Sequence, residues 1–153
     1  MDRGDLVLLE ALQRDSSRSI ADLAEACGMS TSACHRRIKS LEAAGLIEGY
    51  SARLDPQRLG LKLLAFVEIT LTSQSREAMD RFEATVLDYD DILDCHLMSG
   101  NADYLLRVAA SDLEQYDRIH RDCLARLPGV SSMRSAFAIR RIKPWRGYPL
   151  PKA

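Results

Sequence analysis

Apolar residues recur at helical spacing near the start of the chain. In residues 5–14 leucines stand at intervals of three positions, which places them on one face of a helix. Asp5 stands where a side chain could cap the first turn. The spacing predicts an amphipathic helix that buries its leucine face.

Two more helices are predicted directly downstream. Residues 20–27 follow Ser19, a good N-cap, and carry apolar or small side chains at i, i+3, i+4 and i+7. Gly28 then ends this helix, because a left-handed residue costs little there, and Ser30 caps the next one. The third helix has a buried face made of Cys34, Ile38 and Leu41. Two short helices joined by a tight turn that contains glycine predict a helix-turn-helix domain.

The period of the pattern changes after these helices. Residues 47–54 alternate apolar and polar side chains, which predicts a short strand or wing. Asp55-Pro56 marks a turn, and from Leu63 the chain alternates again as a half-buried strand. The elements expected from there are a strand from 63, a helix at 75–88, strands at 92–98 and 104–109, a helix from 112 to 127, and a strand at 130–142.

This order of strands and helices predicts an α+β fold, a ferredoxin-like βαββαβ sandwich behind a three-helix domain of the winged type. The predicted organisation is a helix-turn-helix domain at 1–54, a linker at 55–62, a ferredoxin-like domain at 63–143 and a C-terminal tail at 144–153. Helices cover only one face of such a sheet. Apolar residues on both faces of its strands therefore predict a symmetric dimer.

Charge matters only locally in this chain. The formal net charge is −1, and basic and acidic side chains nearly balance in each half. Three cations nevertheless gather at Arg36, Arg37 and Lys39, beside His35, with no acid before Glu42. Hydroxyls and free N–H groups at the start of the same helix suit phosphate oxygens, and the long cations one turn later suit base edges. The pattern favours double-stranded DNA as the partner over a merely solvated basic face.

Other classes of protein fit less well. No apolar run approaches the roughly 20 residues of a membrane span, and acids stand among the first residues, so the chain is expected to be cytoplasmic. The four cysteines form no C-x-x-C pair, which predicts buried reduced thiols, no metal site and no cofactor. His96 and His120 form no recognisable constellation with the carboxylates, so an enzyme is not expected.

Two segments together carry a family resemblance: "IADLAEACGMSTSACHRRIKSLEAAGLIEGYSARLDPQRLG" and "LMSGNADYLLRV". They resemble the Lrp/AsnC family of regulators, over about residues 5–143. The resemblance implies a winged or extended helix-turn-helix joined to an amino-acid-sensing domain that dimerises and assembles further, to tetramers or octamers. It implies DNA contacts at Ser30, Thr31, Ser32, His35, Arg36, Arg37 and Lys39.

The resemblance also implies an effector site between dimers. Its residues are the loop Met98, Ser99, Gly100, Asn101, Ala102 and Asp103, with a hydroxyl on the last strand at Ser135. Gly100 allows close backbone approach to a carboxylate, and Asp103 could pair with an α-ammonium. The alternative is that Gly-Asn forms an ordinary turn that Asp103 caps. An effector-free architectural protein shares every DNA-binding feature, so titration with amino acids distinguishes the two functions.

Overall fold

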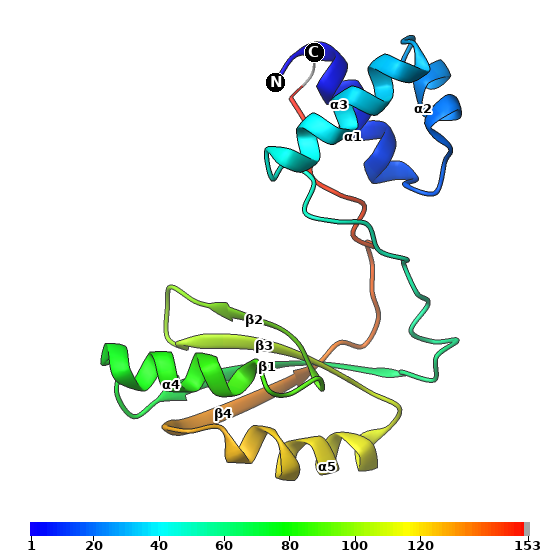
Figure 1. The fold of residues 1–153 in the computed structure, drawn as a ribbon. Helices are drawn as coiled ribbons and strands as arrows, with labels where there is room; N and C mark the ends of the chain where they lie inside the picture. The colour runs from blue at the N-terminus through cyan, green and yellow to red at the C-terminus, as the bar shows by residue number, and fades with distance from the viewer. Residues whose placement is uncertain (152–153) are drawn as a thin grey trace. The chain divides into compact units, whose positions relative to one another are not determined.

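The computed structural model describes residues 1–151 and divides into two compact units (Figure 1). Of the described residues, one unit contains Met1–Arg53 together with 142–151, and the other contains Leu54–Arg141. The predicted boundary between residues 54 and 55 lies within one residue of this division. The C-terminal segment, expected to be a separate tail, groups with the N-terminal unit.

Three helices form the N-terminal unit: α1 (Arg3–Arg14), α2 (Ile20–Ala26) and α3 (Thr31–Ala43). The prediction that Asp5 caps α1 is wrong, because the helix begins two residues earlier and Asp2 is its N-cap. The Asp2 carboxylate accepts from the Asp5 N–H, and the Asp5 carboxylate accepts from the Asp2 N–H, both at 2.9 Å. Such a capping box satisfies two N–H groups that the first turn leaves free.

The helix-turn-helix prediction is confirmed. Ser19 caps α2 and Ser30 caps α3, each by accepting a backbone N–H three residues on. Gly28 has φ +63° in the turn between them, a conformation that glycine adopts without steric penalty. The core of this unit consists of Leu8, Leu23, Ala24, Cys34, Ile38 and Leu41.

The predicted strand at 47–54 is wrong, since that segment has no regular secondary structure. A strand needs a neighbour to satisfy its backbone groups, and no strand lies elsewhere in the described part of the N-terminal unit. Leu46 and Ile47 instead donate their N–H groups to the Leu41 carbonyl, at 3.0 and 3.3 Å, and close the end of α3.

The second unit is a four-stranded sheet with two helices. Its elements are β1 (Leu63–Leu71), α4 (Arg76–Val86), β2 (Ile92–Leu97), β3 (Tyr104–Ala110), α5 (Leu113–Asp122), a short 3-10 turn (Leu124–Arg126) and β4 (Val130–Phe137). The strand order is β2-β3-β1-β4 with antiparallel neighbours. This arrangement confirms the ferredoxin-like prediction.

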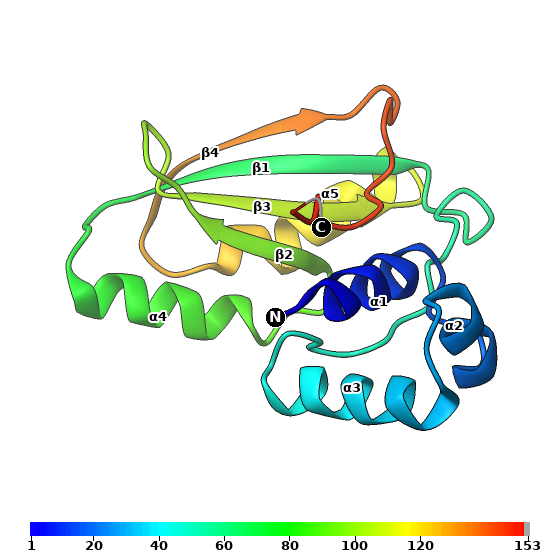
Figure 2. The same cartoon turned by 90° about the horizontal axis from the view of Figure 1, so that it is seen from above.

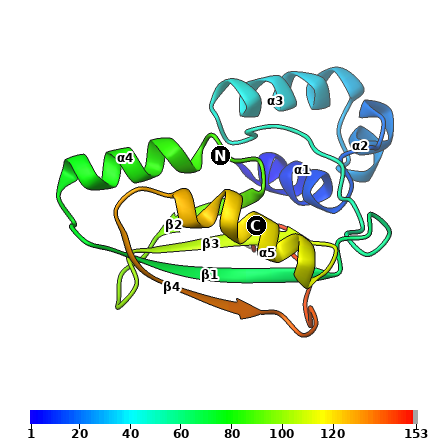
Figure 3. The same ribbon diagram turned by 90° about the horizontal axis from the view of Figure 1, so that it is seen from below.

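One face of the sheet carries the core. Val67 and Ile69 of β1 and Leu106 of β3 are fully buried with Phe82 of α4 and Ile119 of α5. Figure 3 shows α5 in front of the sheet, and Figure 2 shows the opposite side, where the strands lie in front of that helix. The other face of the sheet carries no helix of its own unit.

Two C-terminal elements are shorter than predicted. The helix expected to reach residue 127 ends at Asp122, and a 3-10 turn follows. The strand expected to reach 142 ends at Phe137, because its partner β1 begins at Leu63 and offers no further backbone to pair with. Ala138 makes the last contact, donating to the Leu64 carbonyl at 2.8 Å, and Ile139 is fully exposed.

All four cysteines are free thiols. Burial raises the pKa of Cys95 and of Cys123 to about 11, which keeps both protonated and unreactive near neutral pH. Within residues 1–151, no helix is long and apolar enough to cross a membrane.

Candidate nucleic-acid interface and effector loop

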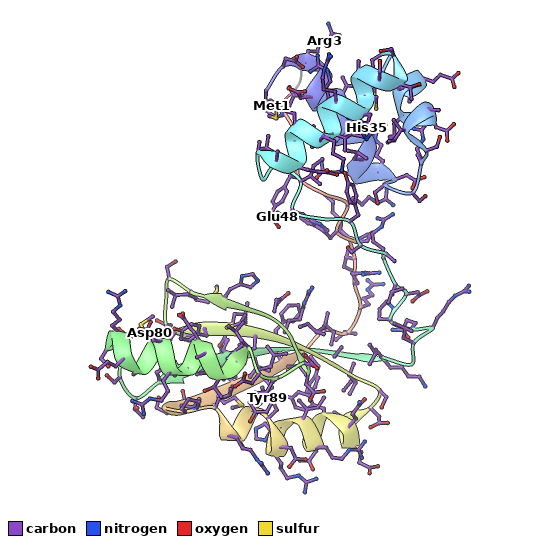
Figure 4. All side chains as sticks on the ribbon, in the orientation of Figure 1. Met1, Arg3, His35, Glu48, Asp80 and Tyr89 are labelled. Carbon is purple, nitrogen blue, oxygen red and sulfur yellow. The ribbon has the colours of Figure 1, made fainter. Side chains whose placement is uncertain are left out.

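The exposed face of α3 carries most of the residues predicted to contact DNA. Thr31, Ser32, His35, Arg36 and Lys39 are exposed, whereas the face with Cys34 and Ile38 packs into the core. Figure 4 labels His35 on this helix. One 13-residue helix therefore presents hydroxyls at its start and long cations one turn later.

Ser30 has a structural role at this helix start. Its Oγ accepts the Ala33 N–H at 3.2 Å and lies 3.3 Å from the Ser32 Oγ. A cap of this kind typically contributes about 1 kcal/mol to stability. The remaining N–H groups of the first turn have no intrahelical acceptor, which suits an anion.

Arg37 lies apart from the other predicted DNA contacts. Its side chain is 33% exposed, and Nη1 lies 2.7 Å from Asp2 Oδ2 and 2.7 Å from Asp5 Oδ1. The Asp5 backbone N–H and the Arg37 guanidinium hold the pKa of the Asp2 carboxyl below its usual range, and Asp2 and Asp5 raise the pKa of Arg37. In the free protein Arg37 thus joins α3 to the N-terminus of α1.

Because of the Asp2–Arg37 pair, we expect the folding stability to decrease in the acid pH range. Because folding lowers the pKa of Asp2 from 3.8, its stabilising effect is present above that value and is lost as pH falls through the lowered pKa. We expect Arg37→Gln to lower the thermal midpoint most at neutral pH and least in acid. Circular dichroism melts from about pH 7 to about pH 2 measure this difference. An equal difference at every pH would contradict the pair.

Lys39 is also paired in the free protein. Its Nζ lies 2.8 Å from Glu42 Oε2, while the Tyr50 hydroxyl donates to Glu42 Oε1 at 3.1 Å. Lys39, and after it Tyr50, hold the pKa of the Glu42 carboxyl below its usual range. Because the Lys39 side chain is 63% exposed, the ion pair is weak and a phosphate oxygen can replace it.

The loop between β2 and β3 contains the predicted effector residues. It is closed by the Met98 N–H, which donates to the Asp103 carbonyl at 2.8 Å. Met98, Ser99, Gly100 and Asn101 are exposed, and Gly100 has φ +148°, a region in which other residues are strained. No backbone hydrogen bond within residues 1–151 uses the N–H groups of Ser99, Gly100 or Asn101.

Asp103 is the buried end of this loop, with 8% of its surface exposed. Its Oδ2 accepts the Leu71 N–H at 2.7 Å, and its Oδ1 accepts from Gln74 Nε2 at 2.7 Å. Its own N–H donates to the Ile69 carbonyl at 2.8 Å. The carboxylate therefore fastens the end of β1 to the start of β3, and among residues 1–151 it makes no hydrogen bond to the Gly100-Asn101 turn that it was considered to cap.

Ser135 lies on β4 and faces α5. Its Oγ is 2.5 Å from the Tyr116 hydroxyl, and the Tyr116 ring meets Phe137 edge-on with centroids 4.9 Å apart. No hydrogen bond found in the described chain joins Ser135 to the loop at 98–103. The two parts of the predicted effector site thus lie on different strands of one protomer.

The open face of the sheet combines apolar side chains with ion pairs. Phe66 is 37% exposed, and Leu64 and Leu105 are half-buried. Two arginines on this face are paired across strands, Arg134 with Glu68 at 2.6 Å and Arg107 with Asp94 at 2.6 Å. Sequence alternation showed the apolar positions. The ion pairs depend on strand register, which alternation does not give.

Both units match known family models. The Lrp/AsnC ligand-binding domain matches residues 64–148, and the AsnC-type helix-turn-helix domain matches residues 1–42. The chain belongs to the Lrp/AsnC family. The predicted resemblance is therefore confirmed. The relatives are transcriptional regulators and not enzymes, as expected from the missing catalytic constellation.

Individual members of the Lrp/AsnC family are similar along nearly the whole chain. The leucine-responsive regulatory protein of Salmonella typhimurium is 38% identical over 143 residues, which is 94% of this chain and 87% of that protein. The Bkd operon transcriptional regulator of Pseudomonas aeruginosa is 39% identical over 142 residues, covering 93% of each chain.

Solved structures of Lrp/AsnC-family regulators have the same fold as this chain. An AsnC family transcriptional regulator from Agrobacterium tumefaciens has a TM-score of 0.91 at 38% identity, covering 97% of both chains. A transcriptional regulator of Neisseria meningitidis, solved as a complex with L-Met, has a TM-score of 0.91 at 31% identity and covers 97% of this chain and 96% of that one.

Proposed function

We propose that this Lrp/AsnC-family regulator reads specific DNA sequences with α3. The observation that carries this proposal is the exposed face of α3, where Thr31 and Ser32 precede His35, Arg36 and Lys39 on a helix-turn-helix. A major groove admits one such helix, so the hydroxyls and helix start meet phosphates while Arg36 reaches base edges. The predicted cytoplasmic location is part of this proposal.

An amino acid or a related small metabolite is the proposed effector, bound between dimers of the C-terminal domain. The exposed N–H groups around Gly100 support a carboxylate at the loop, because they have no backbone acceptor within residues 1–151. The L-Met complex of the Neisseria relative supports an amino acid as the ligand class. Asp103 has a structural role at the end of this loop, because its carboxylate already accepts hydrogen bonds from Leu71 and Gln74.

One experiment tests both parts of the proposal. Gel shifts of the full-length protein with the DNA upstream of its own gene, with and without L-leucine or L-methionine, should show binding that weakens steeply with salt and changes with one of the amino acids. Binding that neither amino acid alters would favour the architectural alternative. Equal affinity for that DNA and for unrelated DNA would contradict sequence-specific reading.

We further propose that the protein dimerises through the open face of the sheet. A lone sheet with Phe66, Leu64 and Leu105 on an uncovered face would expose a contiguous apolar patch to water. A second copy related by two-fold symmetry covers that patch with the same patch of its own. By resemblance to the family, we also propose that these dimers assemble into tetramers or octamers.

The dimer proposal predicts the effect of one charge on that face. Leu105→Glu buries an unpaired carboxylate in the interface, and we expect light scattering to show a smaller assembly or a monomer. Leu113→Glu is the matched control, because Leu113 is 64% exposed on α5, away from the open face. An unchanged mass for Leu105→Glu would exclude this face from the dimer.

A further inference from the structure

The C-terminal segment packs on α1 of the N-terminal unit. The Gln13 side chain forms two hydrogen bonds with the backbone of Tyr148: Nε2 donates to the Tyr148 carbonyl at 3.1 Å, and the Tyr148 N–H donates to Oε1 at 2.6 Å. An amide side chain that pairs with both groups of one residue imitates a step of a β-ladder. The contact joins residues 135 positions apart in the chain.

Gly147 makes this approach possible. It has φ +101°, and a Cβ built there would lie 2.3 Å from Gln13 Oε1. Any other residue would strain the backbone and also displace the Gln13 side chain. The only tryptophan, Trp145, lies edge-on to Tyr148 with ring centroids 4.9 Å apart. The segment is therefore held to α1 through Gln13, while the Trp145 and Tyr148 rings remain mostly exposed.

The segment covers one face of α1. Leu6, Val7 and Glu10 of that helix line a hollow together with Pro149 and Leu150. Figure 2 shows the C-terminal segment on one side of α1 and α3 on the other. The segment therefore contacts α1, whose first turn is held to α3 by Arg37.

The segment also changes the charge of the unit to which it binds. Residues 1–53 contain seven basic and eight acidic side chains, a formal charge of −1. Residues 142–151 add two basic side chains and no acidic one, which makes the described unit +1. A positive domain attracts DNA at long range.

The chain links this segment closely to the other domain. β4 ends at Phe137, and the N-terminal unit begins again at Ile142. The family model of the ligand-binding domain extends to Tyr148, so it includes Gly147 and Tyr148. A segment that belongs in sequence to the ligand-binding domain thus packs with the DNA-binding one.

From these contacts we infer that residues 142–151 are a C-terminal strap, which docks on α1 of the same chain and ties β4 to the DNA-binding domain. The DNA-binding domain is then attached at two points, by the linker after Arg53 and by the strap. This inference rests on the proposed function, because it supplies a route from the last strand, which carries Ser135, to α1 and α3. A second attachment restricts the domain before DNA arrives, which lowers the entropy lost on binding.

Fluorescence of Trp145 in the full-length protein tests the docking. We expect Gly147→Val and Gln13→Ala each to lower its anisotropy, because Trp145 packs edge-on against Tyr148, whose backbone Gln13 then no longer holds to α1. Gly49→Ala is the matched control, since Gly49 has an ordinary φ and free space around it. Equal anisotropy in all four proteins would overturn the strap. An anisotropy difference between wild type and Gln13→Ala that disappears on dilution, as an assembly dissociates, would place the contact between two chains and overturn it as well.

Gel shifts of the same four proteins test whether the strap contributes to DNA binding. The two variants that free Trp145 should bind DNA at least about threefold more weakly than the wild type and Gly49→Ala. Unchanged DNA affinity in variants that free Trp145 would overturn the role of the strap in DNA binding. A wild type that binds no DNA, yet shows docked Trp145, would sink the proposed function and leave the docking supported.

Discussion

Arg36→Ala should weaken DNA binding by the full-length protein by about 1–3 kcal/mol, which is about 5- to 150-fold, with no change in thermal midpoint. Arg36 is exposed on α3 and belongs to no ion pair in the described chain, so its removal leaves the folded domain intact. If it reads a base, specificity relaxes at one position of the site. If it contacts a phosphate, the salt slope falls by about one.

Arg37→Ala is the informative comparison, because the two arginines are neighbours in sequence. Arg37 holds Asp2 and Asp5, so its loss should lower the thermal midpoint as well as any DNA affinity that depends on a well-placed α3. Fluorescence-based melts and gel shifts of both variants separate the two roles. An Arg36→Ala protein that binds DNA like wild type would remove Arg36 from the interface.

Asp103→Ala should destabilise the C-terminal domain by about 3 kcal/mol. Its carboxylate is buried and accepts from the Leu71 N–H and from Gln74, and hydrogen bonds to a charged group contribute about 1.5–3 kcal/mol each. The substitution also leaves the Leu71 N–H without an acceptor. Urea unfolding followed by circular dichroism measures the loss.

Asp94→Ala is the control for Asp103→Ala. Asp94 pairs with Arg107 on the partly exposed face of the sheet, so its loss should change stability by less than about 1 kcal/mol. Equal losses in the two variants would contradict a structural role for Asp103. Because Asp103→Ala weakens the fold, a lost amino-acid response in that variant does not identify a ligand contact. Ser135→Ala, which removes only a hydroxyl bonded to Tyr116, is the better variant for that question.

Periodicity predicted the elements that bury one face. α3 and β1 agree with prediction because Cys34, Ile38, Val67 and Ile69 each stand at the spacing of the element that buries them. The alternation at 47–54 wrongly predicted a strand, since a strand needs a partner strand and the described N-terminal unit contains none. For the same reason β4 ends at Phe137, where its partner strand β1 runs out.

Most long-range contacts had no local signal in the sequence. Arg37 shares its sequence neighbourhood with Arg36, and only the path of α1 determines that Asp2 and Asp5 meet one arginine and not the other. Gln13 and Tyr148 show even less in sequence, since neither an exposed helical glutamine nor a tyrosine between glycine and proline marks a contact. Gly147 was a visible signal, because a glycine amid bulky residues often marks a close backbone approach.

The cross-strand pairs on the open face of the sheet have a consequence for ionic strength. Because Arg134 and Arg107 are neutralised by Glu68 and Asp94 of the same chain, a two-fold-related copy would meet this face without like charges opposing each other. Apolar contact then dominates that association, and apolar contact is strengthened or unaffected by moderate salt. DNA binding through exposed cations responds in the opposite sense. If the proposed dimer and DNA contacts are right, rising salt is expected to release the nucleic acid while leaving the protein assembly together.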